Sequence, residues 1–174
     1  MYAGAMMTDA WFMEQALKQA EYAFSAGEFP VGCVIADQTR ILAVGSRQGT
    51  SGGRANETDH AEMLALQRLA GAAGDEPAGP LSVFCTMEPC LMCFGAILIS
   101  GIHRIVYAYE DAMGGGTRCD LSRLPALYSG APVEIVPHVM RDRSLALFKA
   151  FFSRPDNLYW KHSVLADYTL AQPL

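Results

Sequence analysis

Two short segments carry the residues that most restrict how this chain folds. The first is His60-Ala61-Glu62 and the second is Pro89-Cys90-Leu91-Met92-Cys93. Histidine nitrogen and cysteine sulfur are ligand types that zinc binds in proteins, and three such ligands leave a tetrahedral ion one open position for water. We therefore expect the fold to bring His60, Cys90 and Cys93 together. Glu62 lies beside them in the sequence as an acid that can carry protons.

Both segments are predicted at the starts of helices. One helix is expected over 61–70, after the capping residues Asn56, Thr58 and Asp59. The other is expected over 89–98, because proline is well tolerated in a first helical turn. Cys90 and Cys93 are three residues apart and so share a helix face. The positive end of the helix dipole there favours the thiolate that zinc requires.

Each of these residues also has an ordinary interpretation. The C-x-x-C pair alone fits a redox pair or two buried thiols. His60 alone fits an ordinary histidine, and Glu62 alone fits an acid favoured by a helix N-terminus. Their combination in this order, with proline before the first cysteine, favours a metal site. We interpret the remaining cysteines and histidines as structural: Cys33, Cys85, Cys119, His103, His138 and His162.

Apolar patterning predicts alternating helices and strands along the whole chain. Helices are expected over about 8–26, 61–70, 89–98, 121–127, 141–152 and 157–168, and strands over 29–36, 41–44, 81–85, 103–109 and 133–136. This alternation predicts an α/β fold, a three-layer α/β/α sandwich with a mixed central sheet. We expect residues 1–174 to form a single domain, with the C-terminal helices from about residue 141 packed on it.

Composition restricts the partners. The formal net charge is −5, which gives no general attraction to nucleic acid. An odd count of five cysteines argues against a secreted disulfide framework, and Met1–Thr8 lacks the basic region of a signal peptide. No uncharged apolar run approaches the roughly 18 residues that span a bilayer. We therefore expect a cytoplasmic protein with no membrane contact.

The motifs resemble those of the cytidine deaminase-like superfamily, in the branch that holds tRNA wobble-adenosine deaminases and bacterial guanine deaminases. The likeness covers roughly residues 11–109. It includes A-G-E-F-P-V-G-C-V-I, H-A-E-M-L-A-L and M-E-P-C-L-M-C-F-G-A-I. The resemblance implies the three-layer fold, a homodimer and one catalytic Zn²⁺ ion. It also implies that His60, Cys90 and Cys93 are the metal ligands and that Glu62 moves the protons.

The predicted reaction is hydrolytic removal of an exocyclic amine from a purine-type base or nucleoside, with release of ammonia. A small molecule is then the substrate, and the alternative is a tRNA wobble adenosine. A third class is a non-catalytic, zinc-stabilised binding module. Glu62 and the presence of only three ligands argue against this third class, because structural zinc sites normally have four protein ligands.

The sequence says less about substrate contacts. Members of this branch usually carry a base-binding asparagine in a G-x-N context after the second strand, where this chain has Gly45-Ser46-Arg47. Asn56 is a hypothetical replacement in the loop 45–59, which is either a solvated connector or a pocket wall. Further candidate contacts are Ala61, Glu88 and Pro89. The C-terminal aromatic residues either pack in the core or close the pocket: Phe151, Phe152, Tyr159, Trp160 and Tyr168.

Overall fold

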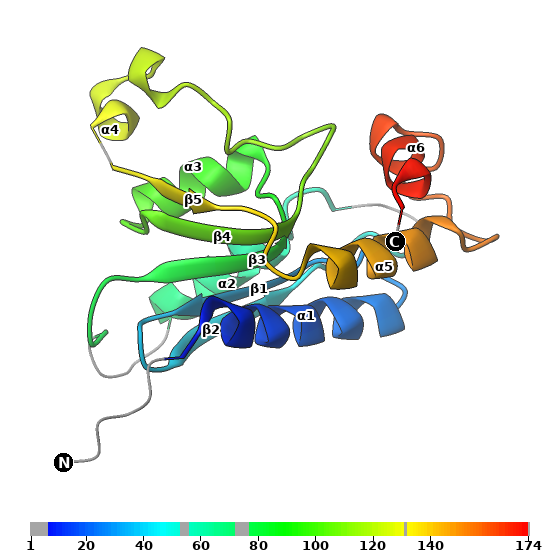
Figure 1. The fold of residues 1–174 in the computed structure, drawn as a ribbon, viewed down its shortest axis with the longest axis horizontal. Coiled ribbons are helices and arrows are strands. Elements are labelled where there is room, and N and C mark those ends of the chain that lie inside the picture. The colour runs from blue at the N-terminus through cyan, green and yellow to red at the C-terminus, as the bar shows by residue number, and fades with distance from the viewer. Residues whose placement is uncertain (1–6, 53–55, 72–76, 131, 174) are drawn as a thin grey trace.

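The computed structural model describes residues 7–52, 56–71, 77–130 and 132–173 (Figure 1). Its elements follow the predicted alternation of helices and strands. In chain order they are α1 (Asp9–Ser25), β1 (Gly32–Ala36), β2 (Ile41–Ser46), α2 (Ala61–Gly71), β3 (Ser82–Met87), α3 (Leu91–Ile99), β4 (Arg104–Tyr109), the 3-10 turn Leu121–Arg123, α4 (Ala126–Ser129), β5 (Glu134–Val136), α5 (Arg141–Phe152) and α6 (Val164–Ala171).

The strands form one mixed five-stranded sheet in the order β2-β1-β3-β4-β5. β1 pairs antiparallel with both β2 and β3, whereas β4 and β5 continue parallel to β3. Strand β1 is buried along its whole length, because it lies inside the sheet with both faces covered. The predicted mixed sheet is confirmed.

Helices cover both faces of the sheet (Figure 1). α1 and α5 lie on one face, and α2 and α3 lie on the other. In α1 the predicted stripe of Phe12, Ala16 and Ala20 is buried against the sheet, as a 3.6-residue period requires. Thr8 caps this helix by accepting a hydrogen bond from the Trp11 amide. The predicted α/β/α sandwich is therefore the observed architecture.

Helix α2 lies unusually close to strand β2. A Cβ atom added at Gly45 would lie 1.9 Å from the carbonyl oxygen of Ala61 and 2.9 Å from the backbone nitrogen of Ala65. No side chain fits in that space, so the start of α2 rests directly on the β2 backbone. This close approach holds the start of α2, which carries Glu62 and follows His60, against the sheet.

The C-terminal region differs from the prediction. A helix over 157–168 was expected, but α6 begins only at Val164, with Ser163 as its N-cap. Trp160 and His162 have positive φ angles of 54° and 60°, which a right-handed helix does not allow. Asn157 also turns the chain by bonding both the amide and the carbonyl of Tyr159. Residues 157–163 are therefore an irregular segment between α5 and α6.

Two smaller expectations are also corrected. α3 begins at Leu91 rather than Pro89, and Cys90 is its N-cap residue in an extended conformation. The 121–127 helix is instead a 3-10 turn followed by α4. Cys33 and Cys85 are buried as expected of structural thiols, whereas Cys119 is exposed. The other predicted elements agree with the structure to within a few residues at their ends.

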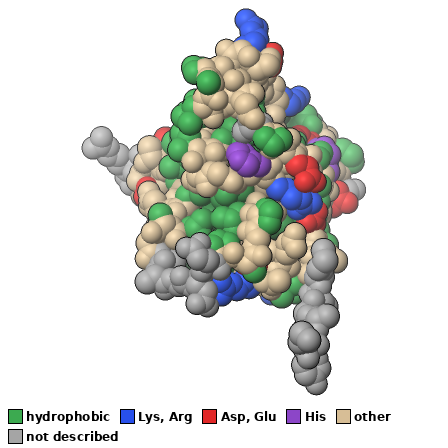
Figure 2. All heavy atoms as spheres, turned by 90° about the vertical axis from the view of Figure 1, so that its left-hand side faces the viewer, with side chains coloured by type: hydrophobic (Ala, Val, Ile, Leu, Met, Phe, Trp, Pro, Cys, Tyr) green, Lys and Arg blue, Asp and Glu red, His purple; other side chains and the backbone are tan. Residues whose placement is uncertain are grey.

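Figure 2 shows the end of the molecule at which β3, β4 and β5 begin. Hydrophobic side chains and charges of both signs are interspersed there, and basic side chains do not gather into a patch. Among the described helices, none combines the length and the apolar character needed to cross a membrane.

Candidate functional site

The three predicted ligands meet at one point. Nδ1 of His60 lies 3.6 Å from Sγ of Cys90 and 3.5 Å from Sγ of Cys93. All three ligand atoms lie within 4.8 Å of one another, which makes them a possible metal-binding group in the described part of the chain. One nitrogen and two sulfur atoms at this spacing fit a zinc ion with three protein ligands.

Local structure explains why the ligands converge. β3 ends at Met87, and three residues later Cys90 caps α3. Cys93 follows in the first turn of α3, so the two sulfur atoms lie on the same side of the helix start. His60 immediately precedes α2, which lies on the same face of the sheet as α3 (Figure 1). Two helix N-termini thus face each other across the site.

The two cysteines differ in their electrostatics, because the hydrogen bond to Cys90 and burial raise the pKa of Cys93. A hydrogen bond from the Cys93 thiol, together with the neighbouring His60, lowers the pKa of Cys90 to about 4 despite its partial burial. The hydrogen bond to Cys90 in turn raises the pKa of His60. This environment favours the thiolate form of Cys90, the form in which cysteine binds metal.

Glu62 stands beside the ligands with an unsatisfied oxygen. Its side chain is buried, and Oε2 has no hydrogen-bond partner among the described residues. Burial raises the pKa of this carboxyl group. A buried, unpartnered carboxyl oxygen is costly unless another group completes its bonding, which fits a carboxyl group that would bond a ligand bound beside His60, Cys90 and Cys93. When zinc is bound at such a site, it supplies an activated water for hydrolysis.

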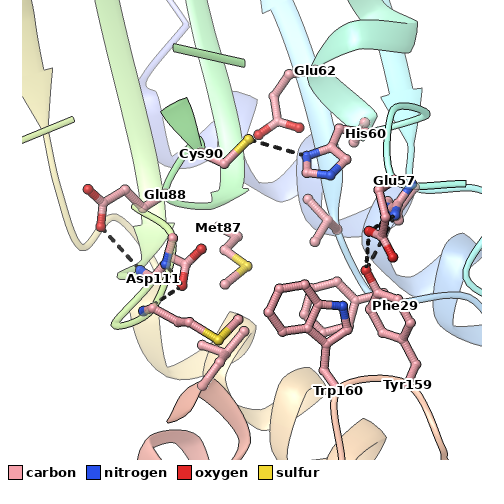
Figure 3. Close-up of a pocket in the computed structure, with 16 residues that line it drawn as sticks. Phe29, Glu57, His60, Glu62, Met87, Glu88, Cys90, Asp111, Tyr159 and Trp160 are labelled. Atoms are coloured by element: carbon pink, nitrogen blue, oxygen red, sulfur yellow. Dashed lines mark hydrogen bonds and ion pairs between the residues drawn. The ribbon is translucent and has the colours of Figure 1, made fainter. Parts of the chain in front are cut away.

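A small cavity of about 120 Å³ opens from the ligands into the protein (Figure 3). His60, Glu62 and Cys90 lie at one end of it, and Phe29, Tyr159 and Trp160 stand at the other. The cavity is smaller than the pockets that hold drug-sized ligands, which are typically at least about 300 Å³. It is therefore suited to a small, flat heterocycle. Its remaining lining is Val31, Arg47, Glu57, Ala61, Met87, Glu88, Asp111, Met113, Gly114 and Leu165.

Glu88 lies in the cavity wall, but its carboxylate is engaged by the loop after β4. It accepts hydrogen bonds from the amides of Asp111 (3.1 Å) and Thr117 (3.3 Å) and from the Thr117 hydroxyl (2.5 Å). A Cβ atom at Gly115 would come within 2.5 Å of this carboxylate, so the loop requires glycine there. Glu88 therefore holds the loop that carries Asp111 and Met113 to the cavity.

The other predicted contacts have different placements. Ala61 lines the cavity, and Pro89 does not, although its carbonyl accepts a hydrogen bond from the Gly116 amide. Asn56 also lies outside the lining, and its Oδ1 atom accepts hydrogen bonds from the amide and hydroxyl of Thr58. Contact of Asn56 with a substrate stays a prediction. Arg47 and Glu57, at the two ends of the same loop, are the residues that reach the cavity.

Sequence reasoning missed Arg47, Glu57 and Asp111. The signal for Arg47 was present, because it occupies the G-x-N position where an asparagine was expected. Asp111 is a polar residue just beyond the end of β4, the position where ligands bind in open α/β sheets. Glu57 carried no local signal, since its role comes from a contact with residues far away in the chain.

The three-ligand cluster, the buried Glu62 and the strand-end cavity together are typical of a catalytic zinc protein. Residues 6–109, more than half of the chain, match the family model described as the cytidine and deoxycytidylate deaminase zinc-binding region. The chain belongs to this family of zinc-binding deaminases, which are hydrolases acting on C–N bonds.

Relatives and solved structures agree with this family. The tRNA-specific adenosine deaminase of Rickettsia felis is 32% identical over 142 residues, covering 82% of this chain and 99% of that protein. A solved structure of a tRNA:A34 deaminase is 28% identical with a TM-score of 0.59, covering 73% of this chain and 96% of that one. The guanine deaminase of Nitrosomonas europaea shares the fold with a TM-score of 0.66 at 20% identity, covering 84% and 85% of the two chains.

Proposed function

We propose that this protein hydrolytically deaminates a free purine-type base. The observation that carries the proposal is the aromatic wall formed by Phe29, Tyr159 and Trp160 at the end of the cavity away from the metal ligands (Figure 3). A base with its exocyclic amine at the metal ligands directs its far edge toward this wall. Its ring then lies among apolar side chains, as a small heterocycle requires.

In this proposal the site residues divide the work as follows. His60, Cys90 and Cys93 hold the metal ion. Glu62 accepts a proton from the attacking water and delivers it to the departing amine, which leaves as ammonia. Its raised pKa supports this role, because a general acid–base group works best when its pKa lies near the working pH. Ala61 and Glu88 line the cavity beside the reacting ring.

Surface charge also favours a free base over a nucleic acid. Five arginines form ion pairs with carboxylates instead of presenting free positive charge: Arg40, Arg47, Arg104, Arg141 and Arg143. The formal net charge is −5. Binding to a polyanion depends on unpaired basic side chains, because they release the counterions of the phosphate backbone.

The second candidate is a tRNA wobble adenosine. It is favoured by the identity to tRNA-specific adenosine deaminases, which extends over nearly the whole length of the Rickettsia felis protein. In this case the C-terminal segment 157–163 has to move away from the cavity to admit a nucleotide in its stem-loop.

One assay separates the two candidates. Ammonia release is measured for adenine, guanine, cytosine, their nucleosides, related aminated heterocycles and a tRNA anticodon hairpin, each at low and high salt. The proposal predicts turnover of a free base with little dependence on salt. Turnover confined to the hairpin, and falling steeply as salt rises, would instead establish the second candidate. Release from no substrate by zinc-loaded protein would reject both.

We also propose that the protein forms a homodimer. Helix α3 exposes three large apolar side chains, Leu91, Met92 and Ile99, at relative accessibilities of 62%, 38% and 59%. Exposed apolar surface is common where subunits meet. Light scattering during gel filtration tests the proposal, and a monomeric mass at micromolar concentration would reject it.

A further inference from the structure

Three residues from distant parts of the chain meet beside the cavity. Arg47 follows β2, Glu57 lies before α2, and Tyr159 belongs to the segment between α5 and α6. Nη2 of Arg47 lies 3.1 Å from Oε2 of Glu57, and the Tyr159 hydroxyl donates to the same oxygen at 2.8 Å. Nη2 also lies 3.4 Å from the Tyr159 hydroxyl. One carboxylate oxygen thus joins the loop after β2 to the C-terminal segment (Figure 3).

Arg47 stabilises the contact between Glu57 and Tyr159 from the protein interior. Its side chain is 2% exposed, and Nη1 donates to the carbonyl oxygens of Gln48 (2.6 Å) and Asn56 (2.8 Å). One planar group thus connects Gln48 and Asn56, which lie on either side of the loop's middle part. A guanidinium group can donate in several directions from one plane, whereas a lysine amine cannot reproduce that fork.

Tyr159 carries the connection to the aromatic wall. Its ring packs against Phe29 at a centroid distance of 5.5 Å and against Trp160 at 5.8 Å. Trp160 itself has a positive φ of 54°, a conformation that costs energy in a bulky residue. Such strain persists only where surrounding contacts hold the backbone in place. The bonds from Tyr159 to Glu57 and Arg47 are contacts of this kind.

We infer that Arg47, Glu57 and Tyr159 form a latch that sets the depth of the cavity and thereby the class of substrate. With the latch closed, the aromatic wall occupies the space beyond the far edge of the base. A nucleoside carries its ribose in that space. The latch therefore selects a free base over the same base carrying a sugar. Tyr159 is the specificity-determining residue, and Arg47 and Glu57 position it. This inference rests on the proposed deamination of a free base.

The test begins with Tyr159→Phe, which removes the hydroxyl and keeps the ring. The efficiency kcat/KM is measured for the base that the wild type deaminates best and for its ribonucleoside. Since a hydrogen bond to a charged group is lost, we expect the base-to-nucleoside ratio to fall about tenfold. KM for the base should rise more than kcat falls, because the metal ligands are unchanged. Tyr22→Phe on the exposed face of α1 is the matched control and should leave the ratio unchanged.

Two further variants test the other members of the latch. Glu57→Gln keeps the size of the side chain and removes its charge. Arg47→Lys keeps the charge and removes the planar guanidinium group with its several donors. Both should shift selectivity toward the nucleoside, as Tyr159→Phe does. If Tyr159→Phe and Glu57→Gln each leave the ratio within about twofold of the wild type, a change below the effect of one hydrogen bond, the selectivity role is overturned.

A measurement without substrate separates this inference from the proposed function. Backbone amides of residues 157–163 should exchange with deuterium faster in Tyr159→Phe and Glu57→Gln than in the wild type, while α1 is unchanged. Faster exchange in a protein that deaminates no free base rejects the proposed function and the selectivity role. It still supports the conclusion that Glu57 and Tyr159 hold residues 157–163 in place. Unchanged exchange in a protein that does deaminate a free base rejects the latch alone.

Discussion

Nδ1 of His60 lies 3.5 Å from Sγ of Cys93, although 33 residues separate them in the chain. This distance is short enough for both atoms to bind one metal ion, and the Cys90 sulfur completes the group. Metal binding and the packing of α2 beside α3 are therefore coupled, because the ligands come from the starts of these two helices.

Loss of one ligand should abolish metal binding. Cys93→Ser replaces a buried thiol with a hydroxyl, a poor zinc ligand, and leaves only two of the three protein ligands. We expect zinc content near zero by elemental analysis, with no ammonia release. Cys119→Ser is the matched control, because Cys119 is exposed and lies outside the ligand group. Full zinc content in Cys93→Ser would show that Cys93 is not a metal ligand.

Glu62→Gln should separate metal binding from proton transfer. The amide keeps the shape of the side chain but cannot accept and return a proton. We expect a normal zinc content and a fall in kcat of about 10²–10⁴-fold, the usual contribution of a general acid–base group. Glu21→Gln, at an exposed position on α1, should leave kcat unchanged. Near-normal turnover by zinc-loaded Glu62→Gln would show that another group transfers the proton.

Gly45→Ala should disturb the metal site from a distance. The new methyl group would lie 1.9 Å from the Ala61 carbonyl, so the start of α2 has to move away from β2 and carry His60 with it. We expect a loss of about 1–3 kcal/mol in the free energy of unfolding and weaker zinc affinity.

The matched control is Gly71→Ala, at the exposed last residue of α2. A Cβ atom there meets nothing within 4 Å, and alanine favours the helix more than glycine does. This variant should be as stable as the wild type or slightly more stable. Denaturant unfolding and zinc titration of both variants provide the comparison, and equal zinc affinity in Gly45→Ala and the wild type would contradict the coupling.

Stability should depend on pH through Glu110. Burial favours its neutral form, but hydrogen bonds from Arg141 and Tyr168 outweigh burial and lower the pKa from 4.5 to about 2. A carboxyl group with a lowered folded-state pKa stabilises the fold above its unfolded pKa and loses that contribution as pH falls toward its folded value. The contribution should therefore be complete above about pH 5 and should disappear between about pH 4.5 and pH 2.

Urea unfolding near pH 6 and near pH 3 checks this expectation. The wild type should lose about 1–2 kcal/mol more than Glu110→Gln over this interval, since only the wild type has the carboxylate to protonate. Glu134→Gln, an exposed partner of Arg104, is the control and should lose as much as the wild type. Equal losses in the wild type and Glu110→Gln would show that this carboxylate does not govern acid sensitivity.

Local sequence patterns were sufficient for most of the elements and for the three residues that can hold a metal ion. The stripe of Phe12, Ala16 and Ala20 predicted α1, because helix periodicity depends only on spacing along the chain. His60, Cys90 and Cys93 were also predictable, because zinc needs a few particular side-chain types near helix starts. The C-terminal helix was predicted too long, since the positive φ angles of Trp160 and His162 come from contacts and not from local propensity.

The sequence by itself determined the alternation of helices and strands and pointed to the possible metal-binding group, with the acid Glu62 beside it. Only the tertiary structure decided what surrounds the substrate. The carboxylate of Glu57 meets Tyr159 across 102 residues, and Asp111 reaches the cavity because Glu88 holds its loop. Such contacts depend on how loops return to the same end of the sheet, and no pattern within a single segment encodes that geometry.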